Sequence, residues 1–331
     1  MPGLLIQETP FKTLKVKELH PTFGAEIEGV DFDNVSDETL QEILAAMAKY
    51  GVCVFRNTSL NDDSHVEFSK RLGELDNIRR YLQGGRGLRY KHYELFDAGN
   101  LDEDNNIVDP ESHRAHANRG NGLFHVDSSF NPRRAGLSLL RAVVIPPKET
   151  GGNTDFADSR AAWDDLPEDL KKELLEGDYA GSHSMAHSRK LASPEYFKDV
   201  EPDKAPQSKH RIVQRHEPSG RMNLYIGAHL HHIEGEGMTP ERSAELVEKL
   251  NKHATQDKYR ITVSWDQPGD MVIWDNRCVM HRAGPWTGGG KYKRDLRRTT
   301  VHDDGPTAWG LNSKEMEMPG SAAWTKPTVG A

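Results

Sequence analysis

Residues 36–51 carry the clearest helical pattern in the chain. Apolar side chains recur there at the spacing of one helix face: Leu40, Ile43, Leu44 and Met47. Ser36 precedes two acidic residues and can accept a hydrogen bond from the free amides of a first helical turn. Gly51 can adopt the left-handed conformation that ends a helix. The pattern predicts a helix over residues 36–51, followed by a short buried strand over residues 51–55.

Four further segments have helical patterns. They cover residues 62–75, 159–166, 167–175 and 239–253. Pro167 suits the first position of a helix, because its missing N–H has no partner to lose there. In the last segment a Thr-Pro-Glu run begins the helix, and the apolar residues Leu246, Val247 and Leu250 face inward. We expect these helices to lie around a core that other elements form.

Short strand patterns recur along the whole chain. Strands and turns are predicted within residues 14–30, and further strands at 136–144, 154–158, 221–227, 259–265, 270–274 and 296–301. The three Trp-Asp pairs lack the even spacing that a propeller requires. The pattern predicts a mainly β fold with flanking helices, in the style of a jelly roll.

Two kinds of segment lack periodicity. Residues 83–121 are rich in Gly, Asp, Asn and Arg, and such a long irregular stretch inside a domain is often a lid over a functional site. We therefore expect this stretch to close over the site. Residues 1–12 are unpatterned and are expected to form a short loose arm, with a second short arm at the C-terminal end.

Composition narrows the class of protein. The chain has 331 residues and a net charge of −8, which argues against general nucleic-acid binding. No apolar run approaches the length that spans a bilayer, and no secretory signal pattern is present, so no membrane partner is expected. The two cysteines, Cys53 and Cys278, imply no disulfide framework, and a reducing cytoplasmic setting is expected.

The candidate chemistry begins with His125 and Asp127. Side chains two apart on an extended segment point to the same face. A third ligand, His281, follows a distant strand. Two imidazoles and one carboxylate can hold Fe(II) by one triangular face and leave the opposite positions open for substrate and oxygen. The sequence therefore predicts a metal site suited to catalysis.

A basic segment follows His281. If residues 294–300 are extended, alternation places four side chains on one face: Arg294, Leu296, Arg298 and Thr300. Two guanidinium groups facing inward need an anion, because a buried unpaired charge is heavily penalised. A dicarboxylate would satisfy them through a bidentate pair. Thr154 follows a Gly-Gly-Asn run and could donate a further hydrogen bond to the same group.

These segments occur in an order that resembles a known family. The chain is similar, over about residues 14–301, to the taurine dioxygenase and 2,4-dichlorophenoxyacetate dioxygenase family of Fe(II)/α-ketoglutarate-dependent enzymes. The segments that carry the resemblance are residues 122–130, 151–154, 274–277, 281–283 and 294–300. The runs that look closest to the phenoxyacetate branch are residues 127–130, 157–162 and 294–300. The resemblance implies a double-stranded β-helix, a cupin-like jelly roll, in a single catalytic domain spanning residues 1–331.

The resemblance also implies roles for particular residues. His125, Asp127 and His281 match the iron ligands of the family. Thr154 and Arg294 match the residues that hold the distal carboxylate of α-ketoglutarate. The cofactor is then Fe(II), with α-ketoglutarate and O2 as cosubstrates.

Two more matches concern the substrate. Asn121 matches an asparagine on the substrate side, and Arg298 matches an arginine near both the cosubstrate and an anionic substrate. The loop at residues 286–293 is slightly longer than usual in the family. The region after Leu75 lacks a clear counterpart of the substrate histidine of the taurine enzyme, which argues against taurine.

The resemblance implies hydroxylation of a C–H bond in a small anionic substrate, a carboxylate, with release of succinate and CO2. Desaturation or ring closure of an amino acid or natural-product intermediate would use the same ligands. A metal-dependent isomerase or hydrolase on a cupin-like barrel, or a non-catalytic small-molecule sensor, would also be compatible with the fold. The sequence leaves the substrate open, and it leaves assembly into a homo-oligomer open.

Overall fold

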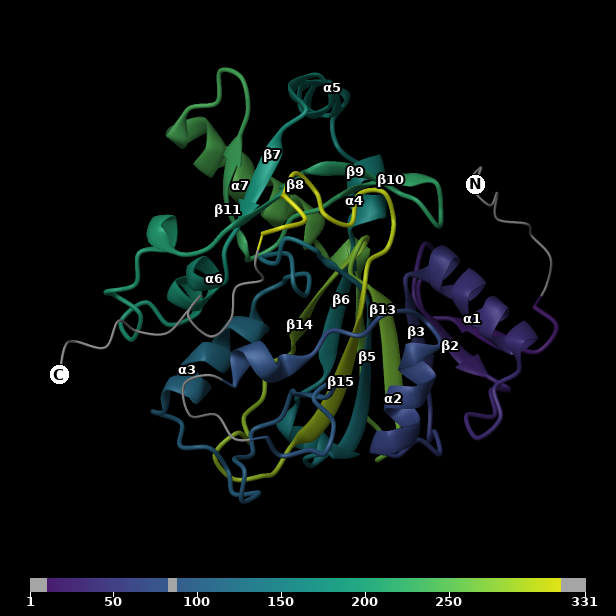
Figure 1. Ribbon diagram of the computed structural model, residues 1–331. Coiled ribbons are helices and arrows are strands. Elements are labelled where there is room, and N and C mark those ends of the chain that lie inside the picture. Colours follow the sequence, from purple (N-terminus) through teal and green to yellow (C-terminus); the bar gives the residue numbers. More distant parts are fainter. Residues whose placement is uncertain (1–10, 83–87, 317–331) are drawn as a thin grey trace.

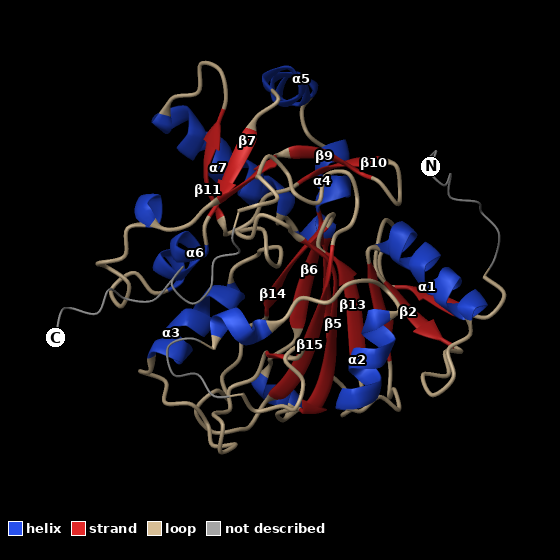
Figure 2. Ribbon diagram, viewed as in Figure 1, coloured by secondary structure: helices blue, strands red, loops and turns tan. Residues whose placement is uncertain are grey.

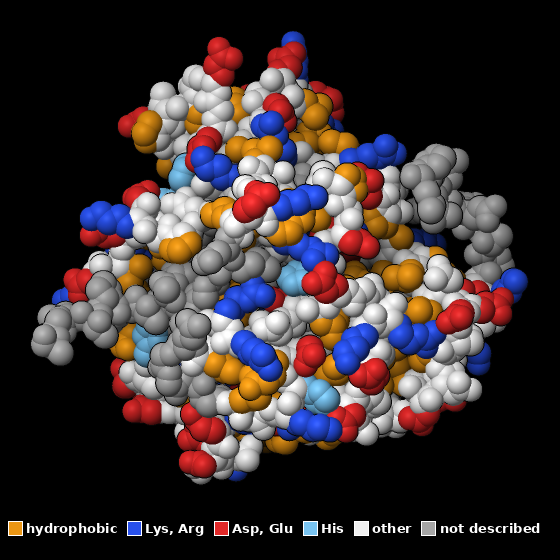
Figure 3. All heavy atoms as spheres, viewed as in Figure 1, with side chains coloured by type: hydrophobic (Ala, Val, Ile, Leu, Met, Phe, Trp, Pro, Cys, Tyr) orange, Lys and Arg blue, Asp and Glu red, His pale blue; other side chains and the backbone are white. Residues whose placement is uncertain are grey.

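The computed structural model describes residues 11–82 and 88–316. Most of the predicted N-terminal arm, the end of the C-terminal arm and the first five residues of the predicted lid lie outside the described residues. Within the described part, no helix combines the length and the apolar character needed to cross a membrane. On the described part of the face shown in Figure 3, acidic and basic side chains are interspersed.

A seven-stranded sheet forms the larger layer of the fold (Figure 1). Its strands, in spatial order, are β1 (Lys15–Glu18), β2 (Ala25–Glu28), β3 (Val52–Phe55), β13 (Met271–Asp275), β5 (Ala135–Val144), β15 (Asp295–His302) and β4 (Phe96–Asp97). All neighbours are antiparallel except β2 and β3. The sheet therefore joins strands from the beginning, middle and end of the chain.

A three-stranded sheet forms the layer that faces it. Its spatial order is β12 (Arg260–Val263), β6 (Thr154–Asp158) and β14 (Val279–Ala283), all antiparallel. One buried cluster joins side chains of both sheets, among them Val52, Leu140, Val272 and Leu296 from the larger layer and Phe156, Ile261 and Val279 from the smaller. Two sheets closed on a common apolar core form the jelly roll that the sequence predicts.

Two small sheets share a buried apolar cluster with the smaller layer. They are β9 (Val213–His216) with β10 (Arg221–Leu224), and β8 (Ser208–Arg211), β7 (Ala180–His183) and β11 (Leu230–Glu234) in the order β11-β7-β8. The helices lie around the sheets (Figure 2). They are α1 (Asp37–Tyr50), α2 (Asp62–Lys70), α3 (His113–Asn118), α4 (Ser159–Asp164), α5 (Glu168–Gly177), α6 (Met185–Ala192) and α7 (Pro240–Ala254). Five short 3-10 turns also occur within the described residues, and η2 (Arg119–Gly122) matters for the site.

Helix α1 forms as its sequence predicts. The Ser36 hydroxyl accepts a hydrogen bond from the backbone N–H of Thr39 at 3.1 Å. Gly51 ends the helix with a φ of 69°, and its N–H donates to the carbonyl of Met47. The apolar face of the helix packs against β3, β5 and β13, in a cluster that includes Ile43, Phe55, Leu139 and Ile273. These contacts confirm the predicted helix.

Helix α2 ends earlier than predicted. It stops at Lys70, whereas the pattern favoured a helix to Leu75. Gly73 has a φ of 150°, and Leu75 pairs with Val301 of β15 as an isolated bridge. The chain leaves the helix there to join the edge of the sheet, because tertiary pairing outweighs the helical tendency of an apolar run.

The stretch predicted to be an irregular lid is partly regular. Its described residues, 88–121, contain β4, helix α3 and most of η2. Strand β4 pairs with β15 at the edge of the larger sheet, and α3 packs beside α6. Phe96 and Asn121 belong to this stretch and line the cavity that holds the candidate site.

Candidate metal centre

His125 and His281 are joined through their backbones. The N–H of each donates to the carbonyl of the other, at 3.0 Å from His125 and 2.9 Å from His281. This isolated bridge attaches the segment after η2 to the middle of β14. It sets the two imidazole rings 4.3 Å apart between centroids. The two residues, far apart in the sequence, are thereby held as neighbours.

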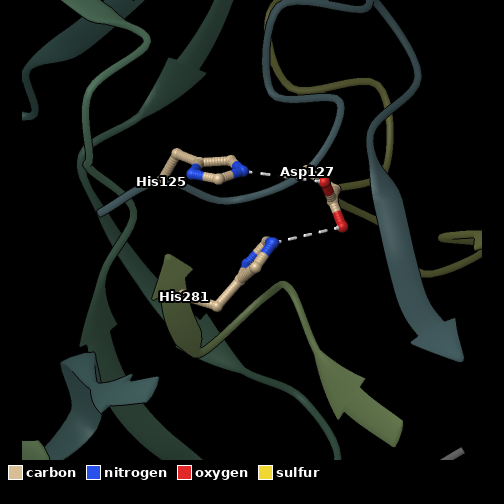
Figure 4. A group of neighbouring side chains, drawn as sticks. All are labelled: His125, Asp127 and His281. Carbon is tan, nitrogen blue, oxygen red and sulfur yellow. Dashed lines mark ion pairs between the residues drawn. The ribbon is translucent and has the colours of Figure 1, made fainter. Parts of the chain in front are cut away.

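Asp127 completes the cluster (Figure 4). One carboxylate oxygen lies 3.9 Å from His125 Nε2 and the other lies 3.7 Å from His281 Nε2. Ligand atoms of the three residues all lie within 4.8 Å of one another, and all three side chains are buried. The predicted convergence of His125, Asp127 and His281 is therefore observed.

The chain reaches this arrangement by a turn rather than by a strand. His125 makes only the single bridge, and Asp127 begins a turn in which Ser128 has a φ of 56°. A positive φ is uncommon for a residue other than glycine. The prediction that His125 and Asp127 lie close together was therefore correct, but the extended segment on which it was based is a turn in the structure.

The protonation states of the cluster suit a cation. Burial alone would raise the pKa of Asp127, but the positive charge of Arg298 and the two imidazoles lower that pKa to about 2. Burial lowers the pKa of His125 and brings the pKa of His281 to about 3. Near neutral pH the cluster thus holds one carboxylate and two neutral imidazoles, which are the ligating forms.

The tautomer of His125 is fixed by the carbonyl of Leu123. The distance from His125 Nδ1 to that oxygen is 2.7 Å, so Nδ1 carries the hydrogen. The lone pair of Nε2 then points toward Asp127 and is free to bind a metal.

Asp127 is positioned by a short hydrogen-bond network. The Ser138 hydroxyl donates to Asp127 Oδ2 at 2.8 Å, and Asn276 Nδ2 donates to Ser138 Oγ at 2.9 Å. Asn276 Oδ1 accepts from the N–H of Asp127 and from the indole N–H of Trp274, each at 3.0 Å. The Trp-Asp-Asn-Arg run near the end of β13 therefore orients the carboxylate. Ser138 was not predicted, because a serine in an apolar strand carries no signal of its own.

A cavity of about 270 Å³ opens beside the cluster. All three cluster residues line it, together with Asn121, Thr154, Arg294 and Arg298, so the structure brings every predicted site residue to one cavity. Much of the remaining lining is apolar: Phe96, Phe130, Leu140, Met185 and Trp274. A concave apolar site with few polar groups suits a small organic molecule.

Arg294 and Thr154 form one wall of this cavity. The Arg294 guanidinium donates to the carbonyl oxygens of Ala98 at 3.1 Å and Gly152 at 3.2 Å. Among the described residues no carboxylate pairs with it, and burial lowers its pKa to about 10. Thr154 Oγ1 accepts from the indole N–H of Trp265 at 3.2 Å, so its own hydrogen remains available for donation. This wall can bind a carboxylate.

Arg298 is already paired. Its Nη1 lies 2.5 Å from Asp127 Oδ1 and donates to that oxygen. The expectation of two guanidinium groups awaiting an anion thus describes Arg294 but not Arg298. Arg189 of α6 also lines the cavity, and it belongs to none of the motifs that predicted the site. In the sequence, an arginine in a short amphipathic helix cannot be told from a solvent-exposed charge. The sequence therefore does not indicate that Arg189 lines a cavity.

Two other groups of potential metal ligands occur among the described residues. In the buried group of His216, Asp275 and Cys278, both oxygens of Asp275 accept hydrogen bonds from Arg277, and burial raises the pKa of the Cys278 thiol. That carboxylate is neutralised already. The other group, at the surface, consists of Asp203, His231 and His232.

A jelly roll that holds two imidazoles and a carboxylate beside a small-molecule cavity defines a class, the metal-dependent oxygenases with a facial ligand set. The family model described as "Taurine catabolism dioxygenase TauD, TfdA family" matches residues 15–300. The chain belongs to this family, and it is an Fe(II)- and α-ketoglutarate-dependent dioxygenase.

Individual relatives agree with the family model. The chain is 36% identical over 294 residues to the α-ketoglutarate-dependent 2,4-dichlorophenoxyacetate dioxygenase of Burkholderia sp. strain RASC, with 86% of this chain and 92% of the relative covered. The enzyme of the same name from Cupriavidus pinatubonensis is 37% identical over 297 residues, with 86% and 96% covered. The crystal structure of AAD-2 with Mn(II) and N-oxalylglycine superposes with a TM-score of 0.80 at 32% identity, covering 89% of this chain and 100% of AAD-2.

Proposed function

We propose that the protein hydroxylates a C–H bond of a small anionic organic substrate while converting α-ketoglutarate to succinate and CO2. A single catalytic domain carries this activity in our proposal. The observation that supports it most strongly is the convergence of His125, Asp127 and His281 in a cavity that also contains the guanidinium of Arg294, which pairs with no carboxylate of the described residues.

The three cluster residues would hold Fe(II). Their buried donor atoms, neutral imidazoles and ionised carboxylate fit a divalent cation, and the donor set matches the facial triad of non-haem iron enzymes. Iron(II) bound with α-ketoglutarate and O2 supplies the oxidising power that amino-acid side chains lack.

Arg294 and Thr154 would bind the distal carboxylate of α-ketoglutarate. The carbonyls of Ala98 and Gly152 hold the guanidinium in place, which reduces the entropy lost when the anion binds. An arginine with no acid partner among the described residues gains more from a carboxylate than an exposed one, because the interaction is poorly screened. The Thr154 hydroxyl adds a second, directional donor.

The apolar lining would exclude water and orient the substrate. Phe96, Phe130, Leu140, Met185 and Trp274 present rings and alkyl groups to the cavity. Such a lining favours a substrate with an apolar body. The relatives that share 36% and 37% of their residues are named for 2,4-dichlorophenoxyacetate, so aryloxy carboxylates are the first substrates to test.

The class of reaction can be tested without knowing the substrate. Anaerobic addition of Fe(II) and α-ketoglutarate should give a weak visible charge-transfer band. His281→Ala should abolish the band. Arg294→Ala should raise the α-ketoglutarate concentration needed for half-saturation by about 100-fold, since losing one partner of a buried charged pair costs several kcal/mol. Arg215→Ala removes an exposed arginine that does not line the cavity and is the matched control.

A band in the wild type that survives His281→Ala unchanged would contradict the proposed ligand set. In a second experiment, succinate release measures turnover of each compound in a panel of carboxylates. Mass spectrometry then gives the mass of the product. A product heavier by one oxygen atom supports hydroxylation, and so does a pair of fragments, a phenol and a 2-oxo acid, whose summed mass exceeds that of the substrate by one oxygen atom. A product lighter by two hydrogen atoms would replace it with desaturation or ring closure.

A further inference from the structure

Three arginines line the cavity within the described part of the chain, and their partners differ. Arg298 donates to Asp127, while Arg294 donates to two backbone carbonyls on the wall that it shares with Thr154. Arg189 has no carboxylate and no hydrogen-bond partner among the residues described, and its Nε is fully enclosed. The cavity therefore contains a second cation, besides Arg294, that no acid of the described chain neutralises.

Arg189 lines a part of the cavity that is formed by α6 and η2, separate from the wall of Arg294 and Thr154. It lies on α6, one turn after Met185, so the two side chains share a helix face. Helix α6 packs against η2, and a methyl group on Gly120 would come within 2.0 Å of Arg189 Nη1. The guanidinium thus occupies space that only a glycine leaves free. Asn121, the next residue, lines the same cavity.

Arg189 shares the cavity with apolar side chains and is electrostatically coupled to the ligand cluster. Ala117, Phe130 and Met185 line the cavity with it. Burial lowers the pKa of Arg189 to about 10, opposed by the negative charge of Asp127. Its charge also acts on His125 and His229. Arg189 is therefore coupled electrostatically to the ligand cluster.

We propose that Arg189 binds the anionic group of the substrate, with Asn121 beside it, while Arg294 serves the cosubstrate alone. This inference rests on the proposed function. It specifies a substrate whose carboxylate or sulfonate meets Arg189 and whose apolar body lies against Phe130 and Met185. It also moves substrate recognition from Arg298, where the family resemblance placed it, to a residue on a different element, because Arg298 is occupied by Asp127.

The test compares four variants loaded with Fe(II) and α-ketoglutarate. Arg189→Met keeps the bulk and removes the charge, Arg189→Lys keeps the charge, and Gly120→Ala pushes the guanidinium from its place through a different residue. Lys190→Met is the matched control, since Lys190 is the next residue on α6 and donates to the carbonyls of Lys198 and Val200 away from the cavity. Binding is read anaerobically from the change that a probe causes in the visible band, and turnover from succinate release.

The probes are 2,4-dichlorophenoxyacetate, an arylmethanesulfonate and the uncharged amide of the first. We expect Arg189→Met to raise KM for the wild type's preferred anion by about 100-fold with a much smaller effect on kcat. Arg189→Lys should recover part of the loss, and Gly120→Ala should weaken anion binding. Binding of the amide should not change in Arg189→Met. The α-ketoglutarate concentration for half-saturation should remain that of the wild type in all four variants.

Three results would overturn the inference while leaving the proposed function intact. The first is an unchanged KM for the anion in Arg189→Met. The second is a wild type that forms the band with α-ketoglutarate but binds neither the carboxylate nor the sulfonate offered. The third is a parallel loss of α-ketoglutarate binding in Arg189→Met, which would assign this arginine to the cosubstrate. Absence of the band in the wild type would contradict the proposed function itself.

Discussion

The hydrogen-bonding role of Thr154 depends on the residue that contacts its hydroxyl group. Thr154 is useful to a carboxylate only if its hydrogen points into the cavity. The indole N–H of Trp265 donates to its oxygen and so leaves that hydrogen free. Trp265 itself does not line the cavity, which makes it a positioning residue.

Replacing this tryptophan gives the first residue-scale prediction. Trp265→Phe should raise the α-ketoglutarate concentration for half-saturation by about 3- to 10-fold, since a neutral hydrogen bond contributes roughly 0.5–1.5 kcal/mol. The band intensity at saturation should not change, because the proposed metal ligands are untouched. The measurement is an anaerobic titration followed in the visible spectrum. Trp163→Phe, in a separate buried cluster, serves as the control, and equal effects from both variants would contradict the prediction.

At this scale the sequence predicted that His125, Asp127 and His281 would lie together, but it did not predict the residues that surround them. The His-x-Asp spacing and the distant His281 carry the chemistry in residue types alone. The pairing of Arg298 with Asp127 could not be predicted, because it depends on the turn at Ser128 that places the carboxylate under β15. Arg189 was missed since only the packing of α6 on η2 brings it to the cavity.

Helices and strands were predicted well where a capping residue or a strict alternation was present. Helix α1 has both its caps in the sequence, and α7 begins at Pro240, directly after the capping Thr239, as its sequence indicates. The end of α2 was misplaced, because the bridge between Leu75 and Val301 joins residues that are remote in the chain. Local periodicity carries no information about such a partner.

The end of α1 gives a prediction at the scale of the element. Gly51→Ala places a side chain at a φ of 69°, and its methyl would lie 2.9 Å from Val279 Cγ2 and 3.0 Å from Arg160 Nη2. We expect the free energy of unfolding to fall by about 1–3 kcal/mol, as for strained backbone positions generally. Urea titration measures the change. Gly290→Ala, where a methyl meets no atom within 4 Å, should leave the urea midpoint unaltered; a similar loss there would refute the explanation.

For the whole molecule, buried histidines make stability depend on pH. His65 of α2 is fully buried, its Nε2 lies 3.2 Å from the Thr299 hydroxyl, and burial together with the charge of Arg141 lowers its pKa to about 3. The unfolded chain takes up a proton at this residue near pH 6.5, whereas the folded protein does not until about pH 3. Its contribution to stability is thus complete above pH 6.5 and declines as the pH falls toward 3.

His65→Gln should make the free energy of unfolding less dependent on pH. At pH 5 the slope should fall by about 1.4 kcal/mol per pH unit, which corresponds to one proton. Denaturant titrations from pH 4 to 7 give the slope directly. His20→Gln, at an exposed turn, is the comparison variant. An unaltered slope in His65→Gln would show that this histidine is protonated in the folded protein.

The fold as a whole was predictable in class but not in topology. Recurrent short strands indicate a β core, and the family resemblance implies the jelly roll. The strand order β3-β13-β5-β15 follows instead from which apolar faces fit together after folding. The site depends on that order, because Arg298 of β15 lies beside Asp127 only when β15 pairs with β5.

Strand β5 is the longest strand of the described chain, and both strands that pair with it are synthesised much later than it is. It pairs only with β13 and β15, whose residues leave the ribosome long after residues 135–144. During synthesis this apolar strand has no native partner for either edge, which is the condition in which strands associate with other chains. A nascent chain that stalls before residue 295 would carry an open sheet and no completed cavity, so its fate would be decided by chaperones rather than by its own stability.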